Sequence, residues 1–485
     1  MNSRRQFLKN LTGAAAVFAI APSLLSKPDK QPPNFIFILT DDQGWTGTSA
    51  SMHPVRPDAV SDYYMTPNIK KLAQQGMRFS NGYCPAAICC PTRRSLQFGQ
   101  TPVRQGDDAR FAENYAPGND RLTIPRLLKS VDSRYRSAHF GKWDLRTELV
   151  PQDIGYDDSD GNTRNTHGNI GSPYTKETKW KKWVKYWTLN DPKRIDTLTT
   201  RANDFMERQV REKRPFYLQL SHYAVHVVMQ CKEETLRKNA DRPLGNRHRN
   251  IPFAAMTEDL DTGVGHLLNK VEELGISDHT YIFYMADNGA VGWFPPTAVN
   301  KLSHHDDVNV PSQNFPLRGG KWTLFEGGIR VPFIVKGPGI EPGSFSKEPV
   351  AGYDILPTIA DLAGYQNKLP DDLDGVSFKL LLDKKGDGEF LRPNGLVFHR
   401  FANYYLHSAI RDGRYKLLRF WNMKGHYQDT PFWKQGKRVL LFDLEADLGE
   451  TRDLSDSMPD KVAELNDKLM NYLNSVDAEV LKKFG

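Results

Sequence analysis

The sequence predicts an α/β fold, with a large doubly wound mixed sheet flanked by helices and a smaller C-terminal α+β domain. Several apolar runs show no alternation with polar residues, which indicates strands buried on both faces. Stretches with apolar residues at helical intervals separate these runs, as the crossovers of a parallel sheet require. Beyond residue 380 a polar stretch precedes shorter strand-like runs and a last amphipathic segment. This change predicts a small antiparallel sheet with a helix.

The elements of the large sheet can be assigned from these patterns. Four runs are expected to form its strands, namely Phe35–Leu39, Phe216–Leu220, Tyr281–Met285 and Val331–Val335. Thr66 and Pro67 begin a predicted helix, because Pro suits the first helical position. A second helix is predicted over 256–274.

The C-terminal part has its own set of expected elements. The strands are expected at Leu396–Phe398, Tyr415–Leu418 and Val439–Phe442. A helix is expected from Asp453 onward, because four apolar residues share one side of it, namely Val462, Leu465, Leu469 and Leu473. The chain therefore divides into a leader (1–26), a large α/β domain (27–380) and a C-terminal α+β domain (381–485).

Composition places few limits on function. The formal net charge of +7 in 485 residues is compatible with an anionic substrate but does not require one. The body of the chain has no block of Lys and Arg long enough for a nucleic-acid arm, so no nucleic-acid partner is expected. Four cysteines are too few for a disulfide framework. Cys84, Cys90 and Cys231 are expected to be buried thiols, with one opportunistic disulfide as the alternative.

The leader carries the features of an export signal. Residues 3–9 read SRRQFLK, and an apolar stretch from Leu11 to about Leu25 follows, too short for a stable membrane span. It resembles a twin-arginine signal, which implies the twin-arginine export machinery as a partner and a periplasmic or otherwise exported location. A membrane-anchored N-terminus is the alternative. Proteins with such signals cross the membrane folded, so any modification of an unfolded segment must precede export.

Polar residues follow two of the predicted strands directly. Asp41 and Asp42 end the first, and Asp287 and Asn288 end the third. Because open α/β sheets place their sites at the carboxyl ends of strands, these side chains can converge. Oxygen ligands without His favour a hard cation, with Ca²⁺ as the first choice and Mg²⁺ as the second. The alternative is that both pairs only cap helices.

A five-residue motif, C-x-P-x-R, runs from Cys89 to Arg93, and Ser95, Leu96 and Gly99 extend it. This motif resembles the signature of the formylglycine-dependent sulfatases, an arylsulfatase-like group of the alkaline phosphatase superfamily. The resemblance implies that Cys89 is oxidised to an aldehyde by a formylglycine-generating or sulfatase-maturating enzyme. It also implies that residue 89 joins the metal ligands and that Arg93 holds the nucleophile's anionic form.

The chemistry of the hydrated aldehyde explains why an oxidised cysteine is useful there. A gem-diol offers one oxygen that attacks sulfur and a second whose deprotonation expels sulfate and regenerates the aldehyde. A plain thiol can perform only the first half. The residues after Cys89 are expected to place it at a helix N-terminus, which favours an anion.

Three further segments resemble the same family: GKWDL at 141–145, SHYAVH at 221–226 and a long match at 317–335. By position, Lys142 and Lys321 are implied to bind sulfate oxygens, which suits the compact charge of lysine. His226 is implied to be the acid that protonates the leaving group. Two C-terminal segments, 407–420 and 440–454, extend the resemblance over nearly the whole mature chain.

One position departs from the family pattern. The family usually has His where this chain has Asp144. A carboxylate there can accept a proton from the gem-diol, but it also repels an incoming sulfate. Asp144 is therefore interpreted as a substitute base, or as a charge offset by a substrate cation or a nearby basic residue. His139 is a further candidate for the missing imidazole.

The expected substrate is a sulfated polysaccharide or oligosaccharide, and three C-terminal residues are candidates for reading the sugar, namely His399, Arg400 and His407. Two alternatives stay open. A phosphonate monoester or phosphodiester hydrolase of the same superfamily can carry the same motif and metal. A catalytically silent carbohydrate-binding homologue would keep the scaffold without turnover.

Overall fold

The computed structural model describes residues 31–171, 186–292, 313–388, 390–400, 406–421 and 437–484. The chain divides into two compact units, Met1–Gln31 and Pro32–Gly485, and every element below belongs to the second. The predicted export signal, residues 1–26, lies outside the described residues. Within the described ranges, no helix has both the length and the apolar character needed to cross a bilayer.

The described residues form a large mixed sheet of eight strands in the order β11-β2-β10-β9-β1-β7-β4-β5. Five neighbours, β9, β1, β7, β4 and β5, run parallel, whereas β10 is antiparallel to both β9 and β2. The bounds are β1 Asn34–Thr40, β2 Met77–Phe79, β4 Arg136–Gly141, β5 Asp158–Ser159, β7 Phe216–Ser221, β9 Thr280–Ala286, β10 Phe333–Lys336 and β11 Phe345–Ser346. The predicted doubly wound mixed sheet is confirmed.

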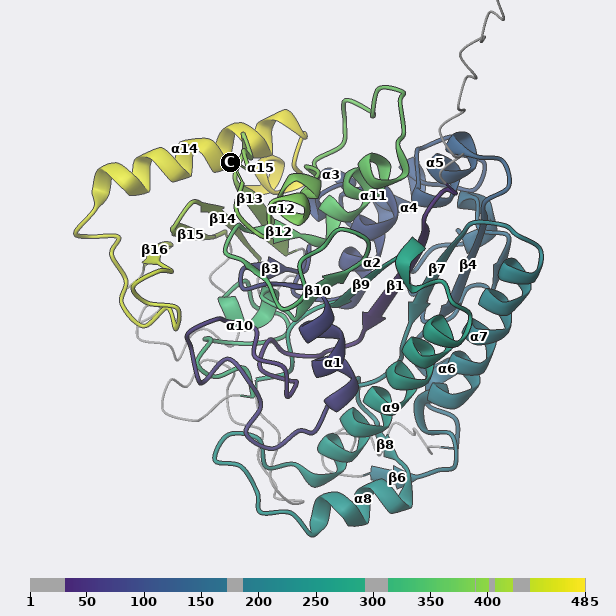
Figure 1. Cartoon of the computed structure of the whole chain (residues 1–485). Coiled ribbons are helices and arrows are strands. Elements are labelled where there is room, and N and C mark those ends of the chain that lie inside the picture. Colours follow the sequence, from purple (N-terminus) through teal and green to yellow (C-terminus); the bar gives the residue numbers. More distant parts are fainter. Residues whose placement is uncertain are drawn as a thin grey trace, which may run out of the picture. The chain divides into compact units, whose positions relative to one another are not determined.

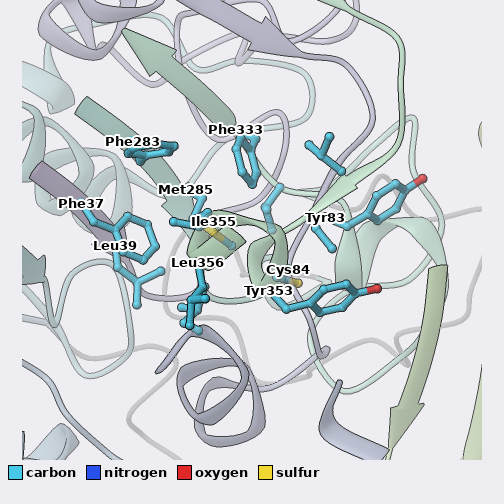
Figure 2. Packing of buried hydrophobic residues seen from close by; sticks show 14 of the residues in the cluster. Phe37, Leu39, Tyr83, Cys84, Phe283, Met285, Phe333, Tyr353, Ile355 and Leu356 are labelled. Atoms are coloured by element: carbon cyan, nitrogen blue, oxygen red, sulfur yellow. The ribbon is translucent and has the colours of Figure 1, made fainter. Parts of the chain in front are cut away.

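Strand β1 lies in the middle of this sheet and is buried on both faces. Phe35, Phe37 and Leu39 belong to one hydrophobic core, and Ile36 and Ile38 belong to the core on the opposite face. Figure 2 shows part of the first core, where side chains of β1 and β9 pack together. A central strand with two buried faces explains why the sequence shows a continuous apolar run.

Helices cover both faces of the sheet (Figure 1). One core takes its side chains from α1 Pro67–Gln75, α7 Ile195–Arg211 and α9 Ile251–Glu273. The other takes them from α2 Cys89–Phe98, α5 Ile124–Val131, α11 Ile355–Ala363 and α12 Lys379–Asp383. The shorter elements are β3 Gly82–Tyr83, α3 Pro102–Gln105, α4 Asp108–Asn114, α6 Asn165–Gly168, β6 Tyr186–Thr188, β8 Met229–Cys231, α8 Glu233–Ala240, α10 Glu326–Ile329 and β12 Val350–Ala351.

The C-terminal part forms a separate antiparallel sheet of four strands, as predicted. Its strands are β13 Leu396–Arg400, β14 His407–Asp412, β15 Tyr415–Phe420 and β16 Val439–Asp443. Helices α14 Pro459–Ser475 and α15 Glu479–Phe484 pack on this sheet through a third core (Figure 1).

One predicted boundary in this part is wrong. The last long helix, α14, begins at Pro459 and not at Asp453. Asp453 instead holds a turn, because its carboxylate accepts hydrogen bonds from the backbone amides of Leu441 and Ser455. The side chain of Asp453 thus satisfies the backbone locally in a non-helical conformation.

A buried charge network joins the small sheet to the segment that follows Lys321. Lys416 on β15 lies 2.8 Å from Glu326 and 2.9 Å from Glu450, with all three side chains fully buried. Arg330 binds the second oxygen of Glu326 at 2.7 Å. Because Glu326 begins α10, just after the Lys321 segment, this network fixes that segment against the C-terminal sheet.

Replacing Lys416 with Met is therefore expected to lower the free energy of unfolding by about 3–5 kcal/mol, because two buried carboxylates lose their shared cation. Urea unfolding measures the loss. The matched control is Lys468→Met, which removes an ion pair with Asp412 at the surface and is expected to cost at most about 1 kcal/mol. Equal stabilities for the two variants would contradict the role given to the network.

Candidate active site and metal centre

The acidic residues that follow β1 and β9 lie together. These strands are parallel neighbours, with Thr40 opposite Ala286, so their carboxyl ends meet at one edge of the sheet. The amide of Asp42 donates to Asp287 Oδ1 at 3.1 Å, and Asn288 Nδ2 donates to Asp42 Oδ1 at 2.7 Å. Asp41, Asp42, Asp287 and Asn288 are all buried. The structure thus brings together the four oxygen-bearing residues that the sequence singled out.

Cys89 is the first residue of α2 and lies beside this acidic cluster. Its Sγ is 3.6 Å from Asp41 Oδ1 and 3.6 Å from Lys321 Nζ. Burial, followed by the charge of Asp41, raises the pKa of the Cys89 thiol well above its usual range. An unmodified cysteine here is therefore a poor nucleophile at neutral pH, since the thiolate is the reactive form.

Two lysines reach the same cluster from different elements. Lys142 follows β4, and its Nζ lies 2.5 Å from Asp41 Oδ2. Lys321 Nζ lies 2.6 and 2.7 Å from the two oxygens of Asp42. Burial alone would lower both lysine pKa values, but Asp41 raises that of Lys142 and Asp42 raises that of Lys321, each to above its usual range. Both side chains are thus charged at neutral pH.

Arg93 lies one helical turn after Cys89 and connects the two strand ends. Its guanidinium donates to Asp287 Oδ2 at 3.0 and 2.7 Å and to the carbonyl of Lys142 at 2.5 Å. The same group lies 3.5 Å from Asp41 Oδ2. Three buried cations, Arg93, Lys142 and Lys321, therefore face three buried carboxylates.

The donor set fits a hard divalent cation. One donor atom each from Asp41, Asp42, Cys89 and His226 lies within 4.8 Å of the others. Asn288 Oδ1 is buried and has no hydrogen-bond partner in the described part of the chain, so it is free to act as a ligand. Burial and the neighbouring charge of Asp41 raise the pKa of Asp287 to about 7, a repulsion that a divalent cation relieves. Carboxylate and amide oxygens favour Ca²⁺ or Mg²⁺.

His226 faces the cluster from the segment after β7. Its Nε2 lies 3.7 Å from Asp42 Oδ2 and 3.5 Å from Asn165 Nδ2, and its Nδ1 contacts the carbonyl of Val227. Burial, followed by the charge of Lys321, lowers the pKa of His226 well below its usual range. The ring is therefore neutral before substrate arrives, and an anion bound beside it favours the protonated form.

Asp144 lies between two basic side chains. Its Oδ2 is 3.4 Å from Lys142 Nζ, and its Oδ1 is 3.8 Å from Arg146 Nε. Oδ2 is buried, and no hydrogen-bond partner for it exists among the described residues. The carboxylate is thus offset by nearby basic residues and keeps one oxygen able to accept a proton. His139, the other candidate, binds Ser221 Oγ at 3.0 Å through its Nε2 and packs against Trp143.

A cavity of about 490 Å³ opens at Cys89. Its described lining has two cationic side chains, Arg146 and Lys321, together with the neutral ring of His226, and no Asp or Glu. Polar groups come from α6 and the residue after it, namely Asn165, Thr166 and Asn169. The cavity therefore offers a positively charged, hydrogen-bonding surface to an anionic ligand.

The sequence did not identify this wall, because loop residues between 146 and 169 carry no periodic signal. Conversely, the structure does not place His399, Arg400 or His407 in the cavity lining. His399 binds Ser408 Oγ at 2.7 Å. His407 Nε2 accepts a hydrogen bond from the amide of Leu324 at 2.9 Å, so it supports the segment that carries Lys321.

Comparison with protein families gives two matches. The model described as Sulfatase matches residues 33–365, and the model described as N-sulphoglucosamine sulphohydrolase, C-terminal, matches residues 320–479. Two curated relatives are N-acetylgalactosamine-6-sulfatase of Mus musculus and Arylsulfatase A of Bos taurus. The first is 28% identical over 82% of this chain and 74% of its own length. Arylsulfatase A is 29% identical over 89% of this chain and 85% of its own length.

Solved structures share the fold. The crystal structure of Ps i-CgsB in complex with k-i-k-neocarrahexaose superposes with a TM-score of 0.68 and 24% identity, over 91% of this chain and 93% of that one. The phosphonate monoester hydrolase SpPMH from Silicibacter pomeroyi superposes with a TM-score of 0.62 and 16% identity, over 93% and 96%. At these identities the likeness shows the fold alone.

Proposed function

Because this chain belongs to the sulfatase family and is a sulfuric ester hydrolase, we propose that it removes sulfate from a sulfated carbohydrate, with a formylglycine at position 89 and a bound Ca²⁺. One observation carries the proposal. Cys89 Sγ lies between Asp41 and Lys321 at a cavity whose described lining is basic and free of acids. A residue oxidised there meets both an oxygen-rich cation site and the cations that bind a sulfate.

The roles of the side chains follow from their positions. Lys142 and Lys321 donate to sulfate oxygens and stabilise the charge that develops on them. Asp41, Asp42, Asp287, Asn288 and residue 89 would hold the Ca²⁺, which when bound would supply Lewis-acid chemistry at the sulfate. Arg93 fixes Asp287 and the backbone of Lys142, so that the two strand ends keep their spacing. The hydrated formylglycine supplies one hydroxyl for attack on sulfur and a second for release of sulfate.

His226 serves as the acid for the leaving alcohol. It must take up a proton first, and the negative charge of the bound sulfate favours this by opposing the depression of its pKa. Its Nε2 faces Asp42 and the cavity, where the bridging oxygen is expected. Its Nδ1 is fixed by the carbonyl of Val227.

The relatives support a sugar as the substrate. They include an N-acetylgalactosamine-6-sulfatase, and one similar structure holds a neocarrahexaose. The leader supports export to the periplasm by the twin-arginine machinery. A formylglycine-generating or sulfatase-maturating enzyme must then act on Cys89 before export, because the folded chain buries that side chain.

Comparing two substrates distinguishes a sulfatase from a phosphonate monoester or phosphodiester hydrolase. We expect a higher kcat/KM for an aryl sulfate than for an aryl phosphodiester, because Lys142 and Lys321 suit a terminal group with three free oxygens. A phosphodiester carries a second organic group in place of one of these oxygens. Faster turnover of the phosphodiester would favour the rival activity of a phosphonate monoester or phosphodiester hydrolase. A phosphonate monoester hydrolase shares this fold.

Asp144 is proposed to be the base that deprotonates the gem-diol. Asp144→Asn is then expected to lower kcat by roughly 10²–10⁴-fold and to change the shape of the pH–rate profile, because general base catalysis contributes on that scale. Steady-state kinetics across pH measure both effects. The control is Asp157→Asn, a surface carboxyl that binds Lys129. An unchanged profile for Asp144→Asn would leave Asp144 only the role of offsetting Lys142 and Arg146.

A further inference from the structure

Lys193 is a buried cation near the cavity that no role above uses. It lies in the short 3₁₀ turn Pro192–Arg194 and is only 1% exposed. Its Nζ donates to Asn169 Oδ1 at 2.5 Å, and it forms no ion pair with a carboxylate in the described part of the chain. Lys142 and Lys321, by contrast, each contact an aspartate. An ammonium keeps three donors, so Lys193 has protons left for another acceptor.

The backbone holds Lys193 in place at a cost. Lys193 and Arg194 both have φ of 54°, in the left-handed region, which is sterically unfavourable for residues that carry a Cβ atom. The amide of Lys193 donates to Gln230 Oε1 at 3.0 Å, and Gln230 lies two residues after Val228 of the cavity lining. Strain of this kind is typical of ligand-binding positions.

Lys193 does not itself line the cavity, but the side chain that its ammonium contacts does. Asn169, which holds the ammonium, lines the cavity on the wall made by α6. Asn165 Oδ1 on the same wall is buried without a hydrogen-bond partner in the described ranges, so it can accept from a sugar hydroxyl. Arg146 adds a second positive charge to the lining. This wall is therefore built to bind polar and anionic groups.

Among the described residues, no carboxylate forms an ion pair with the buried ammonium of Lys193. Burial lowers the pKa of Lys193 to about 7, although the charges of Asp41 and Asp42 act in the opposite direction. An uncompensated buried cation costs several kcal/mol, and an anion bound nearby offsets that cost. The sulfate being removed is already served by Lys142 and Lys321 beside Cys89. An anion that binds Lys193 is therefore expected to be a group other than the sulfate being removed.

We infer that Lys193, with Asn169 and Arg146, binds a second anionic group on the sugar that carries the sulfate being removed. The group is an oxyanion, either a second sulfate or a carboxylate. This inference rests on the proposed function, because it takes the first sulfate to lie at position 89. It makes Lys193 a specificity-determining residue that selects doubly charged sugars over singly charged ones.

Calorimetric binding to the full chain with Cys89→Ala tests the inference without turnover. The probes are monosulfated hexoses of the galacto and gluco series, the matching disulfated hexoses, and the matching sulfated hexuronates. We expect at least one doubly charged sugar to bind about tenfold tighter than its singly charged partner, because hydrogen bonds between charged groups are stronger than those between neutral groups. Adding Lys193→Met should remove that difference and leave the Kd of the monosulfated sugar unchanged. Whether disulfated hexoses or hexuronates show the gain identifies the second group.

The matched control is Lys336→Met, since Lys336 Nζ also donates to an amide oxygen, that of Gln75 at 2.9 Å, but lies on β10. It should keep the tenfold preference. Equal affinities for singly and doubly charged sugars would overturn the inference, as would a preference that survives Lys193→Met. A loss of affinity for all sugars alike would also overturn it. The proposed function is tested by a different measurement. If the wild-type protein does not hydrolyse an aryl sulfate, the proposed function is wrong, whatever the binding experiment shows.

Discussion

Replacing Cys89 with alanine is expected to lower kcat/KM for an aryl sulfate by about four orders of magnitude or more, as removal of a covalent nucleophile does in other hydrolases. The activity is lost because the nucleophile is absent, and the fold is expected to be unchanged. Alanine at position 89 fits the start of α2 but leaves no oxygen to attack sulfur. Steady-state kinetics with the purified variant measure the loss, and thermal unfolding shows whether the fold is intact.

The neighbouring cysteine provides the matched control. Cys90 is equally buried, but its Sγ lies 3.7 Å from the carbonyl of Leu145, away from the acidic cluster. Cys90→Ala should keep activity within about twofold of the wild type, because small changes away from the reacting atoms cost little. Comparable losses in both variants would show that the segment is sensitive to any substitution and that Cys89 has no special role.

Removal of the divalent cation is expected to have the second largest effect. Chelation should lower activity at least about 100-fold, because the ion contributes several kcal/mol of charge stabilisation. The protein should stay folded, since Lys142 and Lys321 offset the charges of Asp41 and Asp42. Ca²⁺ should restore activity better than Mg²⁺, because Ca²⁺ accepts more oxygens in irregular geometry.

Two measurements complete this test. At 100 times its Kd, the ion should stabilise the chelated protein by about 2.7 kcal/mol, which raises the Tm. Asp42→Asn should lose this response, whereas Asp259→Asn, a buried carboxyl on α9 outside the cluster, should keep it. Full activity in protein shown by elemental analysis to hold no divalent metal would contradict the metal centre.

The positions that the sequence predicted well are those where two signals coincide. Asp41 and Asp287 directly follow buried strands, and parallel strands must end at the same edge, so their meeting follows from topology. Cys89 carries a motif that also begins a helix. In both cases a local pattern and a rule of the fold indicate the same site.

The α6 wall and Lys193 could not be predicted in this way. They belong to very short elements, a four-residue helix and a 3₁₀ turn, where the path of the chain depends on single side-chain contacts such as that of Gln230 with the Lys193 amide. The sequence also did not indicate that the side chains of His399 and His407 are buried. Apolar and polar residues do not alternate clearly on the short strands β13 and β14. The sequence therefore does not show which face of the small sheet packs against the third core and which packs against the first core.

The central claim is that residue 89 is a formylglycine beside a divalent ion. The most direct test is mass spectrometry of the tryptic peptide Phe79–Arg93 from protein made in its native host. We expect a peptide that is lighter than the cysteine form by the mass difference between a CH₂SH and a CHO group and that reacts with a hydrazine probe. A sulfatase-active preparation whose peptide carries only the unmodified thiol would contradict the central claim.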